Sequence, residues 1–129
     1  MAEFAKKILV AEDDEVNLMI ADYVLGKAGF SVVAVDNGEA AVDMASKERF
    51  DLILMDIEMP IMSGLEATPL IRQLPTGKDI PIIALTAHSM EEKLEEFKAA
   101  GIDDCLIKPF DKEKFQIIAN KYLAARDSV

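Results

Sequence analysis

Acidic side chains directly follow two of the apolar segments in this sequence. Glu12, Asp13 and Asp14 come after one such segment, and Asp56 and Glu58 come after another. Carboxylates that share one site repel each other and raise each other's pKa unless a cation lies among them. Hard oxygen ligands of this kind suit Mg²⁺, which prefers one or two carboxylates together with water and phosphate oxygens. The residue types therefore predict a magnesium site that can meet an incoming phosphoryl group.

A hydroxyl group and an ammonium group follow two further apolar segments. Thr86 comes after the segment 82–85, and Lys108 comes after the segment 105–107. A threonine hydroxyl can hydrogen-bond a phosphoryl oxygen, and a lysine ammonium group offsets negative charge with three donors. Phosphoryl transfer needs little beyond such positioning and charge stabilisation. Thr86 and Lys108 therefore complete a candidate site for phosphoryl transfer.

A repeated pattern of strand and helix must position these side chains. Five short apolar segments are expected as strands, at 8–11, 32–35, 52–55, 82–85 and, with a weaker signal, 105–107. The segments are apolar throughout rather than alternating, which is typical of parallel strands covered by helices on both faces. The expected fold class is α/β, with an open, doubly wound parallel sheet. The crevice of such a sheet lies at the carboxyl ends of its strands, where all the residues above are found.

Helices are expected in the segments between the strands. Pro69 is unfavourable inside a helix, so we expect the third helix to be kinked or to start late, with Thr68 as its cap. The fourth helix is expected from about Ser89 to Ala100, and the fifth from Asp111. Four glutamates on the fourth helix are most simply a solvated face. They are Glu91, Glu92, Glu95 and Glu96.

Length and composition limit the class of protein. The 129 residues, 51% of them hydrophobic, are enough for one domain, expected at 6–126 with flexible termini at 1–5 and 127–129. A formal net charge of −10 argues against binding to nucleic acid or to an anionic membrane, because both depend on Lys and Arg. The lone Cys105 cannot form an internal disulfide, and the N-terminus lacks the apolar stretch of a signal peptide. A cytoplasmic protein is expected.

The sequence resembles the receiver domains of two-component response regulators, the CheY-like family. Four motifs in register, one at each of four strand ends, carry the resemblance across nearly the whole chain: ILVAEDDEVN, DLILMDIEMPIMSGLEA, PIIALTAH and CLIKPF. The resemblance implies a flavodoxin-like three-layer sandwich whose five-stranded parallel sheet has the order 2-1-3-4-5. It also implies a stand-alone receiver in a phosphorelay, which is no enzyme beyond catalysing its own phosphorylation and dephosphorylation.

The resemblance implies a role for each acidic residue of the site. Asp56 would be the nucleophile that takes a phosphoryl group from the phosphohistidine of a histidine kinase or a histidine phosphotransfer protein. Asp13 and Asp56 would bind Mg²⁺ directly, and Glu12 would act through water. The backbone carbonyl of Glu58 would be a further metal ligand.

The remaining motif residues match parts of the family's switch. Thr86 matches the switch hydroxyl, Lys108 matches the phosphoryl-binding lysine, and the Lys108-Pro109 peptide bond is a candidate cis bond. Phosphorylation would change the affinity of a downstream protein for a surface of helix four, strand five and helix five. Cys105 departs from the family, because many receivers carry at this position an aromatic residue that rotates on phosphorylation.

Two other functions remain as alternatives. The chain could be an interaction module that keeps the fold but works without phosphorylation, although the acids, Thr86 and Lys108 are all present. A flavodoxin-like electron carrier is disfavoured, because Glu12, Asp13 and Asp14 would repel a flavin phosphate. The single histidine, His88, is more simply a surface residue than a metal ligand, although its position two residues after Thr86 is one that tunes phosphoryl hydrolysis in receivers.

Overall fold

Five parallel strands form one sheet in the order β2-β1-β3-β4-β5, which confirms the doubly wound topology expected from the sequence. The computed structural model describes residues 6–87, 91 and 93–127. The strands are β1 (Lys7–Ala11), β2 (Ser31–Val35), β3 (Leu52–Asp56), β4 (Ile82–Thr86) and β5 (Asp104–Ile107). The helices are α1 (Glu15–Lys27), α2 (Gly38–Lys47), α3 (Gly64–Arg72), α4 (Leu94–Ala100) and α5 (Lys112–Asp127).

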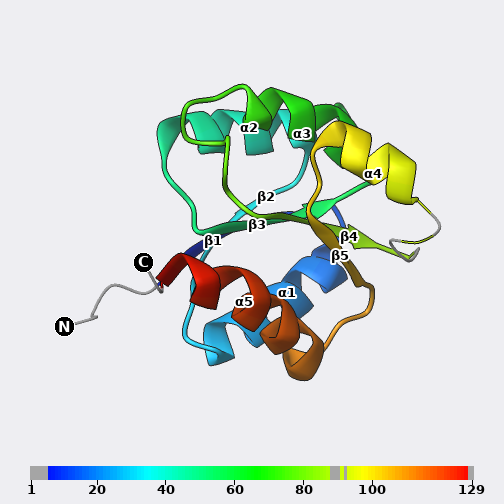
Figure 1. Cartoon of the computed structure of the whole chain (residues 1–129). Coiled ribbons are helices and arrows are strands. Elements are labelled where there is room, and N and C mark those ends of the chain that lie inside the picture. The colour runs from blue at the N-terminus through cyan, green and yellow to red at the C-terminus, as the bar shows by residue number, and fades with distance from the viewer. Residues whose placement is uncertain (1–5, 88–90, 92, 128–129) are drawn as a thin grey trace.

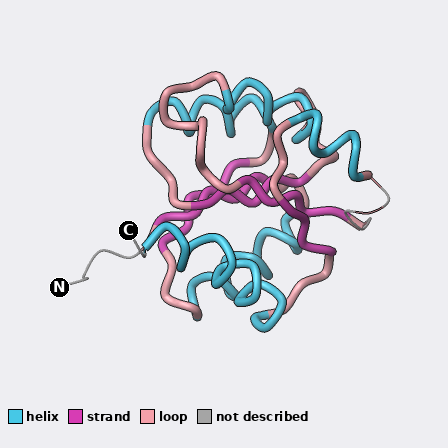
Figure 2. Tube along the Cα trace, viewed as in Figure 1, coloured by secondary structure: helices cyan, strands magenta, loops and turns pink. Residues whose placement is uncertain are grey.

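The sheet is covered on both faces, so the molecule has three layers. Helices α2, α3 and α4 lie against one face, and α1 and α5 lie against the other (Figure 1). The strands run through the middle as one twisted layer (Figure 2). Each face has its own apolar core, and neighbouring residues of β1 alternate between them: Ile8 and Val10 belong to one core, Leu9 and Ala11 to the other. This double burial explains why the strands are apolar throughout.

Helix α3 contains Pro69, which was expected either to kink the helix or to delay its start. Ser63 caps the helix in a capping box: its side chain accepts a hydrogen bond from the Glu66 N–H, and the Glu66 carboxylate accepts one from the Ser63 N–H. The prediction that Thr68 caps a late helix is therefore wrong. Thr68 lies inside the helix, where its hydroxyl donates to the Gly64 carbonyl at 2.7 Å, immediately before Pro69.

Helix α4 is shorter than expected. It begins at Leu94, after Lys93, which makes no side-chain capping bond, and it ends as predicted at Gly101, whose φ of 103° is left-handed. The predicted start at Ser89 and the single histidine, His88, lie outside the described residues. Glutamates at 91 and 95 are four residues apart, and such like charges disfavour helix. The missing side-chain cap at Lys93 and the repulsion between these glutamates both agree with a helix that begins at Leu94.

The ends of the chain complete the fold. Helix α5 begins one residue after Asp111, whose carboxylate accepts a hydrogen bond from the Lys114 N–H at 2.9 Å. Residues 1–5 and 128–129, where flexible termini were predicted, lie outside the described residues, and residue 127 ends α5. None of the described helices combines the length and the apolar character needed to cross a bilayer.

Candidate functional site

Three carboxylates from two adjacent strands meet at one edge of the sheet. Glu12 and Asp13 follow β1, Asp56 ends β3, and the two strands pair in parallel up to Ala11 and Met55. One oxygen atom from each of the three carboxylates lies within 4.8 Å of the others. Glu12 and Asp56 are buried, and Asp13 is exposed. The structure thus brings together the acidic residues that the sequence singled out.

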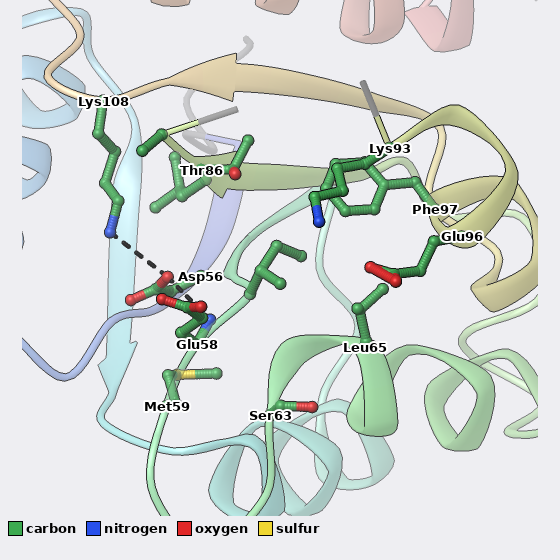
Figure 3. A pocket seen from close by; sticks show the side chains of 13 residues that line it. Asp56, Glu58, Met59, Ser63, Leu65, Thr86, Lys93, Glu96, Phe97 and Lys108 are labelled. Atoms are coloured by element: carbon green, nitrogen blue, oxygen red, sulfur yellow. Dashed lines mark hydrogen bonds and ion pairs between the residues drawn. The ribbon is translucent and has the colours of Figure 1, made fainter. Parts of the chain in front are cut away.

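Lys108 extends its ammonium group into this acidic cluster from the loop after β5. Its Nζ lies 3.3 Å from Glu12 Oε1 and 3.3 Å from Asp56 Oδ1. Figure 3 shows the ion pair with Asp56 as a dashed line. The Lys108 backbone N–H donates to the Thr86 carbonyl at 2.9 Å, which ties this loop to the end of β4. The Lys108-Pro109 peptide bond is cis, as the resemblance implied.

The electrostatics of the cluster favour the arrival of a cation. Burial, together with the hydrogen bond and the negative charge of Glu12, raises the pKa of Asp56 to about 6, although Lys108 and the Glu58 N–H oppose this shift. Burial lowers the pKa of Lys108, but the charges of Asp56 and Glu12 raise it overall. One ammonium group therefore leaves negative charge in the site uncompensated, and a divalent ion would stabilise the ionised carboxylates.

Asp56 lies in a pocket with a volume of about 560 Å³. Thr86 is buried and lines this pocket together with Asp56 and Lys108, so the predicted hydroxyl and ammonium group share one space with the predicted nucleophile. The pocket continues between α3 and α4 (Figure 3). Its wall there is formed by Ile57, Met59, Ser63, Leu65, Lys93, Glu96 and Phe97.

Two acidic residues near the cluster have other contacts. Glu58 donates its N–H to Asp56 Oδ1 at 3.2 Å, and its exposed side chain lines the pocket, while the metal-ligand role of its carbonyl stays a prediction. Asp14 caps α1, because its carboxylate accepts a hydrogen bond from the Asn17 N–H at 2.9 Å. The Asp14 N–H donates in turn to Glu12 Oε2 at 3.1 Å, which holds the buried glutamate in place.

The contribution of the α4 region to the pocket was not predicted. Lys93, Glu96 and Phe97 all line the Asp56 pocket. The solvated face predicted for the glutamates is confirmed for the three that the structure describes, because Glu91, Glu95 and Glu96 are exposed. A helix starting at Ser89 would have placed Lys93 in its second turn, with no reason to point toward β3. The sequence contained one indication that Lys93 could line the pocket. Lys93 and Phe97 are four residues apart, and residues with this spacing share one side of a helix.

Comparisons with known proteins agree with this geometry. The sequence pattern of the family described as response regulator receiver domain matches residues 8–120. The crystal structure of the receiver domain of sensor histidine kinase PA1611 from Pseudomonas aeruginosa, with a magnesium ion coordinated in its active site cleft, superposes with a TM-score of 0.87 and 36% identity. It covers 94% of this chain and 99% of that one. The Vibrio cholerae chemotaxis protein CheY4 gives a TM-score of 0.87 at 32% identity, over 92% and 99% of the two chains.

Similar sequences also occur within much longer proteins. Hybrid signal transduction histidine kinase I of Dictyostelium discoideum is 40% identical over 122 residues, and sensor histidine kinase GacS of Pseudomonas protegens is 37% identical over 121 residues. These alignments cover 89% and 92% of this chain but only 7% and 13% of the two relatives. Sequence, fold and the convergence of acids and lysine agree, and the chain belongs to the response regulator receiver domain family.

Proposed function

We propose that Asp56 accepts a phosphoryl group from a phosphohistidine and that the modified protein changes its affinity for a partner. The observation that carries this proposal is the contact of one buried aspartate with a second carboxylate and with an ammonium group, Lys108, in an open pocket. Such a carboxylate is a positioned nucleophile whose added charge already has a counter-ion beside it.

The chemistry requires few groups. An Asp56 carboxylate oxygen attacks phosphorus, and the bond from phosphorus to the donor imidazole nitrogen breaks. The departing nitrogen takes up a proton from solvent, so the products are an acyl phosphate and neutral histidine. Lys108 offsets charge on the transferred group, and the Thr86 hydroxyl donates a hydrogen bond to one of its oxygens. Water later attacks phosphorus, which releases inorganic phosphate and restores the carboxylate. The protein thus catalyses only its own phosphorylation and dephosphorylation.

Mg²⁺ is the cation that we propose for the acidic cluster. Glu12, Asp13 and Asp56 supply hard oxygen donors, which fit Mg²⁺ better than a transition metal that prefers nitrogen or sulfur. Asp13 and Asp56 would bind it directly, Glu12 through water, and the Glu58 carbonyl would add a ligand. The bound ion would supply positive charge that lowers the pKa of Asp56 and neutralises the phosphoryl oxygens.

The partners follow from the same chemistry. The donor would be a histidine kinase or a histidine phosphotransfer protein. The two longer relatives described above are both named as histidine kinases. The output partner would bind the surface of α4, β5 and α5, where Ile107, the last residue of β5, is 41% exposed. The single thiol, Cys105, fits a cytoplasmic location.

Covalent labelling tests this proposal. Incubation with acetyl phosphate and Mg²⁺ should add the mass of one phosphoryl group, and Asp56→Asn should abolish the addition. EDTA should prevent labelling of the wild-type protein. A modification that survives the Asp56→Asn change would contradict the assignment. A protein that binds neither Mg²⁺ nor beryllofluoride would instead favour an interaction module that works without phosphorylation.

A further inference from the structure

The pocket around Asp56 contains two charged side chains that no step above uses. Lys93 and Glu96 reach into it from the start of α4, and Figure 3 shows both side chains pointing toward the space in front of Asp56. Lys93 immediately precedes α4, and Glu96 lies in its first turn. Lys93 is half-buried, and among the described residues none forms an ion pair with its ammonium group.

The opposite charges of these two residues respond in opposite ways to phosphorylation. An aspartate carboxylate carries one negative charge, whereas a phosphoryl group carries about 1.5 to 2. Lys93 is half-buried in the pocket that it shares with Asp56, so the added charge acts on it more strongly than across open solvent, whereas Glu96 is exposed and its interaction is more strongly screened. Lys93 is attracted toward the phosphoryl group, and Glu96 is repelled by it.

The other end of α4 is held in place. The Arg72 side chain donates from Nε and Nη2 to the Gly101 carbonyl, at 3.1 and 2.8 Å, directly after the last residue of α4. Arg72 also forms an ion pair with Asp103 at 2.8 Å, in the loop that leads into β5. Movement of α4 would therefore be concentrated at its N-terminal end, where Lys93 and Glu96 lie.

The usual aromatic route from the site to this surface is absent from β5. Cys105 occupies the position where many receivers carry a rotating aromatic residue, and it pairs with Ala84 of β4 as a partly buried small side chain. The small Cys105 side chain cannot change the surface by rotating between a buried and an exposed position, as an aromatic side chain can. Another connection between Asp56 and α4 is required if phosphorylation changes the α4 surface.

We propose that Lys93 and Glu96 form a charge couple on α4 that senses the phosphorylation of Asp56. Lys93 is a positioning residue that draws the start of α4 toward the phosphoryl group, and Glu96 favours the unphosphorylated arrangement. This inference rests on the proposed phosphorylation of Asp56. According to this inference, Lys93 and Glu96 couple the charge on Asp56 to the position of the start of α4. The two residues have opposite effects on the equilibrium between its unphosphorylated and phosphorylated arrangements.

Linkage makes this couple measurable without a natural partner. A group that responds to the phosphoryl charge must also change the affinity of the site for a phosphoryl analogue, by the same factor. In titrations with beryllofluoride in the presence of Mg²⁺, Lys93→Gln should raise Kd by roughly twofold to fivefold, the range expected for one partly exposed charge pair. Glu96→Gln should lower Kd by a smaller factor, about twofold, because its carboxylate is exposed, and Lys93→Arg should keep the wild-type value.

The same helix offers matched controls. Lys98→Gln and Glu95→Gln remove the same charges from α4 at positions that do not line the Asp56 pocket, so Kd should stay within about 1.5-fold of wild type after screening by salt. NMR spectra with and without beryllofluoride should show smaller changes in the α4 amides of Lys93→Gln than in wild type. A structural role for Lys93 would not produce opposite signs in the two variants.

The outcomes separate this inference from the proposed function. Binding of beryllofluoride with the same Kd in wild type, Lys93→Gln and Glu96→Gln would overturn the charge couple and leave Asp56 phosphorylation intact. Equal changes in the Lys98→Gln and Glu95→Gln controls would also overturn it, because the effect would then come from the net charge of α4. No binding to the wild-type protein would overturn the proposed function itself.

Discussion

Asp56 combines burial with a nearby like charge, and this combination makes it both unstable as an anion and suited to its proposed task. The carboxylate is 4% exposed and borders Glu12, so its charged form is disfavoured until positive charge arrives. Lys108 supplies part of that charge at 3.3 Å. The metal-free protein should therefore show a cost of ionising Asp56 that the metal-bound protein does not show.

Stability of the metal-free protein should fall as this carboxyl ionises. The unfolded chain ionises Asp56 near its ordinary pKa of 3.8, whereas the folded protein keeps the proton until about pH 6. The folded state binds more protons between these values, so this residue's contribution to the free energy of unfolding decreases as pH rises through that window. The decrease is on the order of 3 kcal/mol, because the two pKa values differ by roughly two units and one unit corresponds to about 1.4 kcal/mol.

The Asp56→Asn variant isolates this contribution. Urea unfolding in EDTA should show the variant gaining stability relative to wild type from pH 4 to pH 6, with a constant difference above pH 7. Other carboxylates titrate in both proteins, so their effects largely cancel in the comparison. A difference that does not change with pH would contradict the raised pKa of Asp56.

Two glycines should respond to alanine in opposite directions. A Cβ at Gly64 would press against the Asp56 carbonyl oxygen and lie 2.8 Å from Met55 Cγ, so Gly64→Ala should lower the free energy of unfolding by about 1–3 kcal/mol. It should also slow phosphoryl labelling, because the backbone of the nucleophile must shift. Gly26 lies exposed within α1 with open space around it, so Gly26→Ala should stabilise the protein by about 1 kcal/mol at an unchanged labelling rate.

Arg72, the last residue of α3, links that helix to the end of α4. The Arg72 Nη1 atom donates to the carbonyls of Gly77, Lys78 and Ile80, at 3.0, 3.2 and 2.7 Å. With its bonds to Gly101, the guanidinium group thus holds the loop before β4 and the end of α4 together. Only the planar fork of arginine can reach these carbonyls at once.

Loss of this guanidinium group should cost more than loss of an ordinary surface charge. Arg72→Met leaves several partly buried carbonyls without their donor, so the free energy of unfolding should fall by about 2–4 kcal/mol in urea titrations. Arg72→Lys keeps the charge but should recover less than half of the loss. Arg49→Met, at an exposed position, is the control and should change stability by less than about 0.5 kcal/mol. Equal effects at positions 49 and 72 would contradict this role.

The strands were predictable from sequence, and two helix starts were not. Each expected strand lies within one residue of the observed bounds, because burial on both faces produces a continuous apolar segment. The start of α3 was missed because Pro69 was given more weight than the capping box of Ser63 and Glu66. The start of α4 was missed because helical periodicity continues upstream of Leu94, and periodicity alone does not define a boundary.

The same distinction applies to the site. The strand order alone brings together at one edge the residues that end strands or closely follow them, which are Glu12, Asp13, Asp56, Thr86 and Lys108. Lys93 and Glu96 depend on where α4 starts and how it turns toward β3, which is a matter of tertiary packing. Sequence reasoning therefore found the residues placed by the sheet and missed those placed by a helix.

At the scale of the whole molecule, the excess of acidic residues produces charge repulsion that opposes folding. Part of this repulsion is concentrated in one cluster of carboxylates. The chain has 24 acidic and 14 basic residues, so compaction brings like charges together. Monovalent salt at 0.1 M screens that repulsion between charges more than about 10 Å apart, without preference for any site. A bound divalent ion acts only where Glu12, Asp13 and Asp56 converge.

Mg²⁺ should therefore stabilise the protein beyond its effect as a salt. At matched ionic strength and 100 times its Kd, Mg²⁺ should raise the free energy of unfolding by about 2.7 kcal/mol over KCl, because it binds the folded state. Asp13→Asn removes an exposed carboxylate of the cluster and should abolish most of this increment while keeping the response to KCl. Thermal or urea unfolding in the two salts measures both effects. An equal Mg²⁺ increment in wild type and variant would show that the ion acts by screening, and that the acidic cluster is not its site.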